Sequence, residues 1–353
     1  MEEFKSRVNL TELTQKVEEI KKELANYLVG QHQLVEYLII ALLADGHVLI
    51  EGVPGVAKTL TAKLLAKSIH ADFKRIQFTP DLMPGDITGT SIYNSKNNDF
   101  EFKRGPLFTN IVLADEINRA PAKTQAALFE AMEERQVTVD GKTYDLDFPF
   151  MVLATQNPIE QEGTYRLPEA QLDRFIFKLL VDYPNLQEET EILQKAHVQA
   201  NHIDFTKISA ILNKQEIISL RTTMQNVLVE EHLFKYIAQI VGSTRQNPSL
   251  YLGASPRASI AILRAAKACA CINGRDFVSP NDIKQVCAPV LRHRVVLTPE
   301  KEMEGISIDT VIHQLVDKIE ILKQIHYVNF VTSRAGRHAT DQYHSSSHVK
   351  KYA

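Results

Sequence analysis

The residues that could do chemistry begin with a loop between a short apolar run and a helical pattern. Residues 51–66 read EGVPGVAKTLTAKLLA, and they differ from the phosphate-binding pattern G-x-x-x-x-G-K-[ST] only because Ala57 stands where the second glycine belongs. In such a loop, backbone N–H groups and a helix N-terminus surround the phosphates. Lys58 would add a point charge, and the Thr59 hydroxyl would reach Mg²⁺. The alternative is a chance glycine loop that binds nothing.

Ala57 decides whether this loop can still hold a nucleotide. Glycine is essential only where φ is positive or where the backbone approaches the ligand too closely for a Cβ. We expect Gly52 and Gly55 to occupy the turn, and Ala57 to lie in the first helical turn with a negative φ. Alanine would then cost nothing on the backbone. We therefore predict that the whole loop binds the nucleotide through Gly52, Val53, Pro54, Gly55, Val56, Ala57, Lys58, Thr59 and Leu60.

Two carboxylates and an amide follow two further apolar runs. Asp115 and Glu116 end the run IVLADE, and Asn157 ends the run VLATQN. Polar residues at the carboxyl ends of parallel strands gather along one edge of the sheet, where α/β folds bind ligands. We expect Asp115 to bind Mg²⁺ through its water shell, Glu116 to orient the attacking water, and Asn157 to contact the γ-phosphate or that water. The alternatives are a solvated acidic pair and an Asn-Pro step that simply begins a loop.

The elements that must position these residues follow from the spacing of apolar side chains. A first amphipathic helix is predicted because apolar residues recur every three or four positions at Leu10, Leu13, Val17, Ile20 and Leu24. A second helix is expected over 32–44, a buried strand over 47–52, and a third helix from Lys58. Short apolar strands that alternate with helices indicate a parallel sheet covered on both faces. Asp140-Gly141 separates two alternating segments, which predicts a β-hairpin.

Composition excludes several classes of protein. The 353 residues, of which 44% are hydrophobic and 24% charged, suit two or three ordinary globular domains. The longest apolar run, YLIIALLA, is too short to cross a bilayer, and residues 1–22 are too charged for a signal peptide, so we expect a cytoplasmic protein. Three cysteines without a C-x-x-C spacing indicate neither disulfides nor zinc. A net charge of −3 argues against nucleic acid as the main partner.

Taken together, these motifs resemble the MoxR family of AAA+ ATPases over about residues 10–325. The strings that carry the resemblance are EGVPGVAKT, IVLADEINRA, QAALFEAMEERQVTVDG, VLATQNPIEQEGTY, LPEAQLDRF and GASPRA. The resemblance implies an α/β fold, in which a P-loop NTPase core with a parallel sheet flanked by helices precedes a smaller, all-helical lid domain. We place the core at 1–185, the lid at 186–326 and a disordered tail at 327–353. Residues 81–105 look like the family's helix-two insert, and the hairpin at 140–141 looks like its insert before the first sensor.

The resemblance also implies roles for individual residues. Lys58 and Thr59 would be the Walker A pair, and Asp115 and Glu116 the Walker B pair. Asn157 would be a first sensor, and Arg174 would be an arginine finger that acts on the neighbouring subunit's nucleotide. Arg257 would be a second sensor on the lid, and Gly30-Gln31 would be an adenine-side loop. Arg166 stands where relatives commonly have proline, and it is the alternative finger.

The function that the resemblance implies is Mg²⁺-dependent ATP hydrolysis by a homo-oligomeric ring, typically a hexamer. Such a protein would act as a chaperone-like remodeller that helps to assemble or activate client protein complexes, with a von Willebrand factor A domain protein as the implied partner class. One alternative is a nucleic-acid motor or loader, which the absence of a basic bias disfavours. Another is a regulatory subunit that binds nucleotide but rarely turns over, which the presence of Glu116 and Arg174 disfavours.

Overall fold

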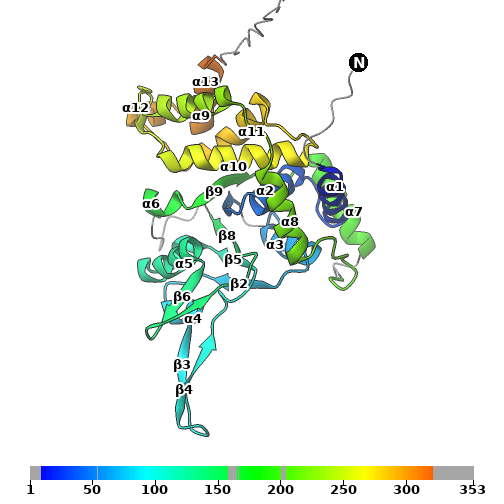
Figure 1. The fold of residues 1–353 in the computed structure, drawn as a ribbon, viewed down its shortest axis with the longest axis vertical. Helices are drawn as coiled ribbons and strands as arrows, with labels where there is room; N and C mark the ends of the chain where they lie inside the picture. The colour runs from blue at the N-terminus through cyan, green and yellow to red at the C-terminus, as the bar shows by residue number, and fades with distance from the viewer. Residues whose placement is uncertain (1–8, 54, 158–164, 166, 200–203, 321–353) are drawn as a thin grey trace, which may run out of the picture. The chain divides into compact units, whose positions relative to one another are not determined.

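The computed structural model describes residues 9–53, 55–157, 165, 167–199 and 204–320 (Figure 1). Pro54, Arg166 and the predicted disordered tail from residue 327 lie outside these residues. No helix among the described residues is long and apolar enough to span a membrane.

A five-stranded parallel sheet lies at the centre of the α/β part. Its strand order is β2-β5-β8-β1-β9. The strands are β2 (Phe73–Gln77), β5 (Ile111–Asp115), β8 (Met151–Gln156), β1 (His47–Gly52) and β9 (Phe175–Val181). Three of them, β1, β5 and β8, are the strands that the apolar runs predict. The predicted fold class is confirmed, and β2 and β9 complete the sheet.

Apolar cores on both faces explain the continuous hydrophobic runs of the central strands. In β1, Val48 and Ile50 belong to one buried cluster, whereas Leu49 between them belongs to the other. The first cluster contains α1 (Thr11–Ala25), α2 (His32–Leu43) and α3 (Lys58–Ser68), and the second contains α5 (Ala122–Glu134). A strand that is buried on both faces needs no polar alternation, as its sequence shows.

Two β-hairpins are attached to the sheet. The first follows α4 (Pro84–Thr88) and pairs β3 (Gly89–Asn94) with β4 (Asp99–Arg104); Figure 1 shows it extending away from the sheet. The second pairs β6 (Gln136–Val139) with β7 (Lys142–Asp145). Its turn is Asp140-Gly141, and both residues have positive φ, 51° and 74°. Positive φ at both central positions is the mark of a type I′ turn, so the predicted hairpin is confirmed.

The C-terminal part is mainly helical, as predicted. Its helices are α7 (Leu186–Gln199), α8 (Lys214–Gln225), α9 (Glu231–Thr244), α10 (Pro256–Ile272), α11 (Pro280–Leu291), α12 (Pro299–Met303) and α13 (Ile308–Lys318). It also contains a two-stranded sheet of β10 (Leu250–Leu252) and β11 (Val296–Leu297), which the all-helical prediction did not include. One apolar cluster runs from α1 and α2 into α10 and α11, so the domain boundary near residue 185 stays a prediction.

Candidate active site

The predicted phosphate loop joins the carboxyl end of β1 to α3, which begins at Lys58. Gly52 is the last residue of β1 rather than part of the turn, and a Cβ there would lie 2.5 Å from the Val181 carbonyl oxygen on β9. Gly55 has φ +87°, which only glycine adopts readily. Lys58 Nζ donates to the Gly52 carbonyl at 2.6 Å. Lys58 and the described part of the loop therefore lie at the carboxyl end of β1, and phosphate binding there stays a prediction.

Ala57 contradicts the prediction that it lies in the first helical turn with a negative φ. It is the N-cap of α3, with φ 58° and ψ 21°, and its carbonyl already accepts the helical hydrogen bond from Thr61 N at 2.9 Å. The chain leaves the loop and enters the helix through this one left-handed residue. A left-handed residue with a Cβ costs roughly 1–2 kcal/mol relative to glycine. This left-handed conformation explains why the phosphate-loop pattern has a glycine at this position. Ala57 adopts the same conformation in spite of its Cβ.

A mostly apolar cavity of about 260 Å³ adjoins the loop. The loop contributes Gly55, Val56, Ala57 and Leu60, the segment before α2 contributes Tyr27, Leu28, Val29 and Gln31, and the segment around α7 contributes Pro184, Ile192, Lys195 and Ala196. Gly30, the neighbour of Gln31, has φ +72°. Of the two residues predicted for the adenine side, Gln31 lines this cavity, and binding of a base there stays a prediction. The contribution of α7 could not be predicted, because nothing in the sequence of residues 186–199 indicates that they line a cavity.

The predicted Mg²⁺ ligand Asp115 and the predicted catalytic Glu116 lie at the carboxyl end of β5. Asp115 accepts hydrogen bonds from Thr155 Oγ1 on β8 and from Arg75 Nε and Nη2 on β2, the latter two at 3.0 and 2.6 Å. Glu116 has a left-handed φ of 56°, donates its backbone N–H to Thr155 Oγ1 at 2.9 Å, and forms an ion pair with Arg119 at 3.0 Å. Sequence reasoning missed Thr155, because a threonine in an apolar run reads only as a strand former.

The polar strand ends meet the phosphate loop at one edge of the sheet. Burial, the largest cause, lowers the pKa of Lys58, and the nearby charges of Asp115 and Glu116 oppose this shift. Asn157 directly follows β8, the neighbour of both β1 and β5. The structure therefore brings together four of the predicted site residues, Lys58, Asp115, Glu116 and Asn157, on one side of the sheet.

The two predicted arginines lie together, but at the opposite edge of the sheet, which is formed by the amino ends of the strands. Arg174 directly precedes β9, whose first residue pairs with His47 at the start of β1. Arg257 lies in the first turn of α10 and lines the same cavity, of about 480 Å³, as Arg174 and His47. Six residues of β1, at about 3.3 Å each, separate this edge from the phosphate loop. Neither side chain is long enough to reach the Lys58 of its own chain.

Both arginines bind the same carboxylate. Arg174 Nη2 lies 2.7 Å from Glu133 Oε2, and Arg257 Nη2 lies 3.0 Å from Glu133 Oε1. Glu133 is in the last turn of α5, and sequence reasoning did not single it out. The competing finger candidate, Arg166, lies outside the described residues, so the choice between the two arginines remains a prediction.

Comparison with known proteins places this architecture in a family. The model of the ATPase family associated with various cellular activities (AAA) matches residues 47–177, and the model of the AAA lid domain matches residues 242–315. A crystal structure of a protein from Cytophaga hutchinsonii, assigned as an ATPase, is similar at a TM-score of 0.82 with 45% identity, covering 88% of this chain and 96% of that one.

Two relatives match over most of their length. Uncharacterized protein YeaC of Bacillus subtilis is 50% identical over 83% of this chain and 91% of its own. Chaperone MoxR1 of Mycobacterium tuberculosis is 45% identical over 85% of this chain and 80% of its own. The AAA match spans the loop at the end of β1 and the acidic residues at the end of β5, and the lid match spans α10, α11 and α12 of the helical part. The chain therefore belongs to the MoxR family of AAA+ ATPases, and it is an ATP-hydrolysing enzyme.

Proposed function

We propose that the active sites of this ATPase are shared between neighbouring subunits of a ring. The observation that carries the proposal is the position of Arg174 and Arg257 at the sheet edge opposite the phosphate loop. The surface with the arginines differs from the surface with the loop, so contact between two copies is head-to-tail. Such contacts form a ring when the rotation from copy to copy closes, as we propose here. A hexamer is the size that the family resemblance implies.

Within each shared site, one subunit would hold the nucleotide. The loop N–H groups and Lys58 bind its phosphates, and the apolar cavity beside Gly30-Gln31 receives its base. Thr59 and Asp115 offer hydroxyl and carboxylate oxygens, the ligand types that Mg²⁺ prefers, and few protein ligands suffice because the phosphates supply the rest. When bound, Mg²⁺ neutralises charge on the β- and γ-phosphates.

The remaining groups would act on the attacking water and the developing charge. Glu116 orients the water, and Asn157 fixes it or the γ-phosphate. The left-handed backbone of Glu116 supports a functional role, because strained residues that the surroundings hold in place cluster at active sites. Arg174 and Arg257 of the adjacent subunit would neutralise the oxygens of the transferred group.

We further propose that the ring remodels client protein complexes in the cytoplasm. A relative that is 45% identical carries the name Chaperone MoxR1, which supports a chaperone-like role. The β3–β4 and β6–β7 hairpins contact each other, because Phe102 of one stacks on Tyr144 of the other with ring centroids 4.4 Å apart. Since a movement of one hairpin would then move the other, the two are candidate surfaces for transmitting force to a client. A protein with a von Willebrand factor A domain is the partner class that the family resemblance suggests.

Separating binding from hydrolysis tests the assigned roles. Lys58→Ala should lose most nucleotide binding because it removes the phosphate charge. Glu116→Gln and Arg174→Ala should both bind nucleotide normally and hydrolyse it at least a thousandfold more slowly. For Arg174→Ala the magnitude follows because an arginine finger contributes on the order of 10³ to 10⁵ in rate. Titration with a fluorescent ATP analogue and phosphate release measure the two properties. If Arg174→Ala lost binding as Lys58→Ala does, the arginine would belong to its own subunit's site.

A further inference from the structure

We propose that Glu133 is a positioning residue that joins Arg174 to Arg257, so that the two arginines meet the neighbouring subunit's phosphate as a pair. This role rests on the shared active site proposed above. It assigns a task to a carboxylate that is neither in the phosphate loop nor at the end of a strand.

The carboxylate of Glu133 is divided between the two guanidinium groups. Oε2 accepts Arg174 Nη2 at 2.7 Å, and Oε1 accepts Arg257 Nη2 at 3.0 Å. Carboxylates and phosphates offer arginine the same kind of partner, a set of close anionic oxygens. Glu133 therefore holds the two Nη2 groups side by side, at the spacing that adjacent oxygens of one anion require.

The two arginines depend on Glu133 to different degrees. Arg174 is also held by the Phe129 carbonyl, to which its Nη1 donates, and its guanidinium lies 5.9 Å from the centre of the Phe129 ring. The Arg257 side chain is 57% exposed, and among the described residues its guanidinium bonds only to Glu133. Arg257 is thus the side chain that would lose its orientation without Glu133.

The charges of the cavity leave Glu133 as the acid available to this pair. Five arginines line the cavity, against three carboxylates, which are Asp45, Glu133 and Asp173. Asp45 pairs with Arg135 and Arg221, and Asp173 pairs with Arg294. Two guanidinium groups close together repel each other, and the repulsion is strongest where solvent is partly excluded. Without the charge of Glu133, the arginines would move apart.

The backbones that carry the two arginines are already fixed to each other. Asp173, next to Arg174, accepts from Arg294 Nε at 2.6 Å and from Ser255 Oγ at 2.9 Å. Ser255 is the N-cap of α10, two residues before Arg257. Asp173 therefore sets the distance between the two segments, and Glu133 sets the direction of the two side chains. Groups that are oriented before the reaction lose less entropy when the phosphate arrives.

Replacement of Glu133 by glutamine tests this role, because glutamine keeps the size and loses the charge. We expect Glu133→Gln to lower ATP turnover about tenfold or more, while the affinity of the phosphate loop for ATP stays within about twofold, since that loop lies at the other edge of the sheet. The matched control is Glu134→Gln, which makes the same change on the next, exposed residue of α5. Glu133→Asp keeps the charge but sets the carboxylate back by one methylene, so that it no longer reaches both guanidinium groups. It should also lower turnover and is the variant to use if the glutamine protein does not fold.

Subunit mixing distinguishes a positioning role from a general structural defect. Glu133→Gln mixed with Glu116→Gln should regain activity, because some interfaces then combine an intact Glu116 with an intact arginine pair. Glu133→Gln mixed with Arg174→Ala should not exceed the sum of the separate activities, since both changes damage the same face. The reference mixture is Glu116→Gln with Arg174→Ala, which should regain activity.

The opposite results would overturn the role of Glu133, the shared site, or both. Full turnover of Glu133→Gln, or restoration when it is mixed with Arg174→Ala, would overturn the role of Glu133 even if the reference mixture regains activity. A reference mixture that stays inactive although mixed rings form would overturn the shared site and, with it, the role of Glu133.

Discussion

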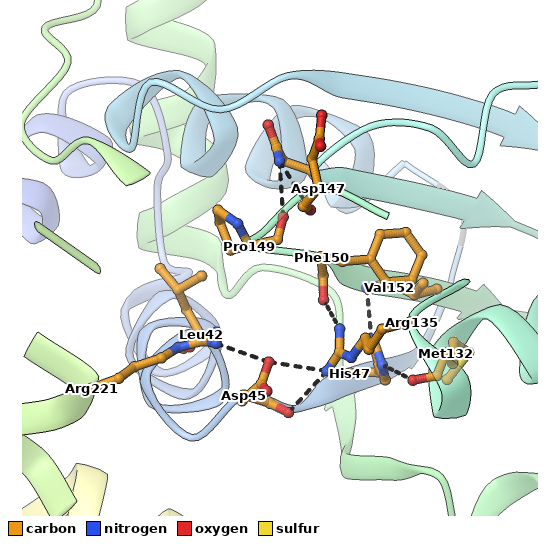
Figure 2. Close-up of polar contacts among 11 residues, drawn as sticks. Leu42, Asp45, His47, Met132, Arg135, Asp147, Pro149, Phe150, Val152 and Arg221 are labelled. Carbon is orange, nitrogen blue, oxygen red and sulfur yellow. Dashed lines mark hydrogen bonds and ion pairs between the residues drawn. The ribbon is translucent and has the colours of Figure 1, made fainter. Parts of the chain in front are cut away.

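His47 should make the stability of this protein depend on pH, because its imidazole is buried and bonded at both ring nitrogens. Figure 2 shows the side chain at the start of β1, among Arg135, Val152 and Met132. Nδ1 accepts the Val152 N–H at 3.0 Å, so Nε2 carries the proton and donates to the Met132 carbonyl at 3.1 Å. Burial, the largest cause, and the positive charge of Arg135 lower the pKa of His47 from 6.5 to about 3, against the opposing effects of the Met132 carbonyl and Asp45.

The folded and the unfolded chain protonate His47 at different pH values, and this difference sets the sign of the effect on stability. The unfolded chain takes up a proton on His47 below about pH 6.5, whereas the folded chain does so only near pH 3. Between these values the unfolded state holds more protons, so stability is complete above pH 6.5 and falls as the pH decreases. From pH 7 to pH 5 the loss is about 2 kcal/mol for this one residue, taking 1.36 kcal/mol for each pH unit below 6.5. Burial lowers the pKa of His293 as well, and its contribution has the same sign.

Urea unfolding at pH 7 and pH 5 measures this loss. His47→Gln cannot titrate, so the difference between the two pH values should shrink by about 2 kcal/mol, although the variant is less stable at pH 7 by about 1–3 kcal/mol because the Val152 N–H loses its acceptor. The control is His32→Gln, which replaces an exposed histidine on α2 and should keep the full pH dependence. If His47→Gln lost as much stability as the unchanged protein between pH 7 and pH 5, the buried imidazole would not be the titrating group.

Two further predictions concern the phosphate loop and the class of substrate. Ala57→Gly should change ATP affinity by less than about tenfold, or 1.4 kcal/mol, because the free loop already holds the left-handed φ. The same change should raise the free energy of unfolding by about 1 kcal/mol through relief of backbone strain; ATP binding a hundredfold tighter would show that the free loop is not preformed. ATP turnover should be insensitive to single- and double-stranded nucleic acid at low salt, where backbone electrostatics are strongest. A several-fold, salt-sensitive stimulation would indicate a nucleic-acid motor.

The parts of the site that the sequence could predict are those fixed by local patterns. Lys58 opens a helix directly after a glycine turn, and Asp115 and Glu116 end an apolar strand, so their meeting at one sheet edge follows from the parallel topology. The φ of Ala57 could not be predicted in this way, because it depends on the angle at which the chain enters α3. A residue beside a helix start can be the N-cap or the first helical residue, and the letters do not distinguish the two.

The sequence could predict that two arginines belong to the site, but not that their side chains meet. Arg174 and Arg257 are 83 positions apart, and their meeting depends on how α10 packs beside the start of β9. Glu133 is one of three acids in the string EAMEE, where the pattern of α5 marks an exposed helical face. Asp173 pairs with the buried Arg294, and these two residues also lie far apart in the chain. Contacts of this kind come from tertiary packing, which no local pattern contains.

The most direct test of the shared active site is to mix two inactive proteins. Glu116→Gln lacks the residue proposed to orient the water, and Arg174→Ala lacks the arginine proposed to complete the neighbouring site. In randomly mixed rings with equal amounts of each, roughly a quarter of the head-to-tail interfaces should combine an intact Glu116 with an intact Arg174. We predict that ATP turnover returns toward that fraction of the activity of the unchanged protein, with mixed rings verified by native mass spectrometry. Mixed rings that remain inactive would show that Arg174 does not complete the neighbouring subunit's site.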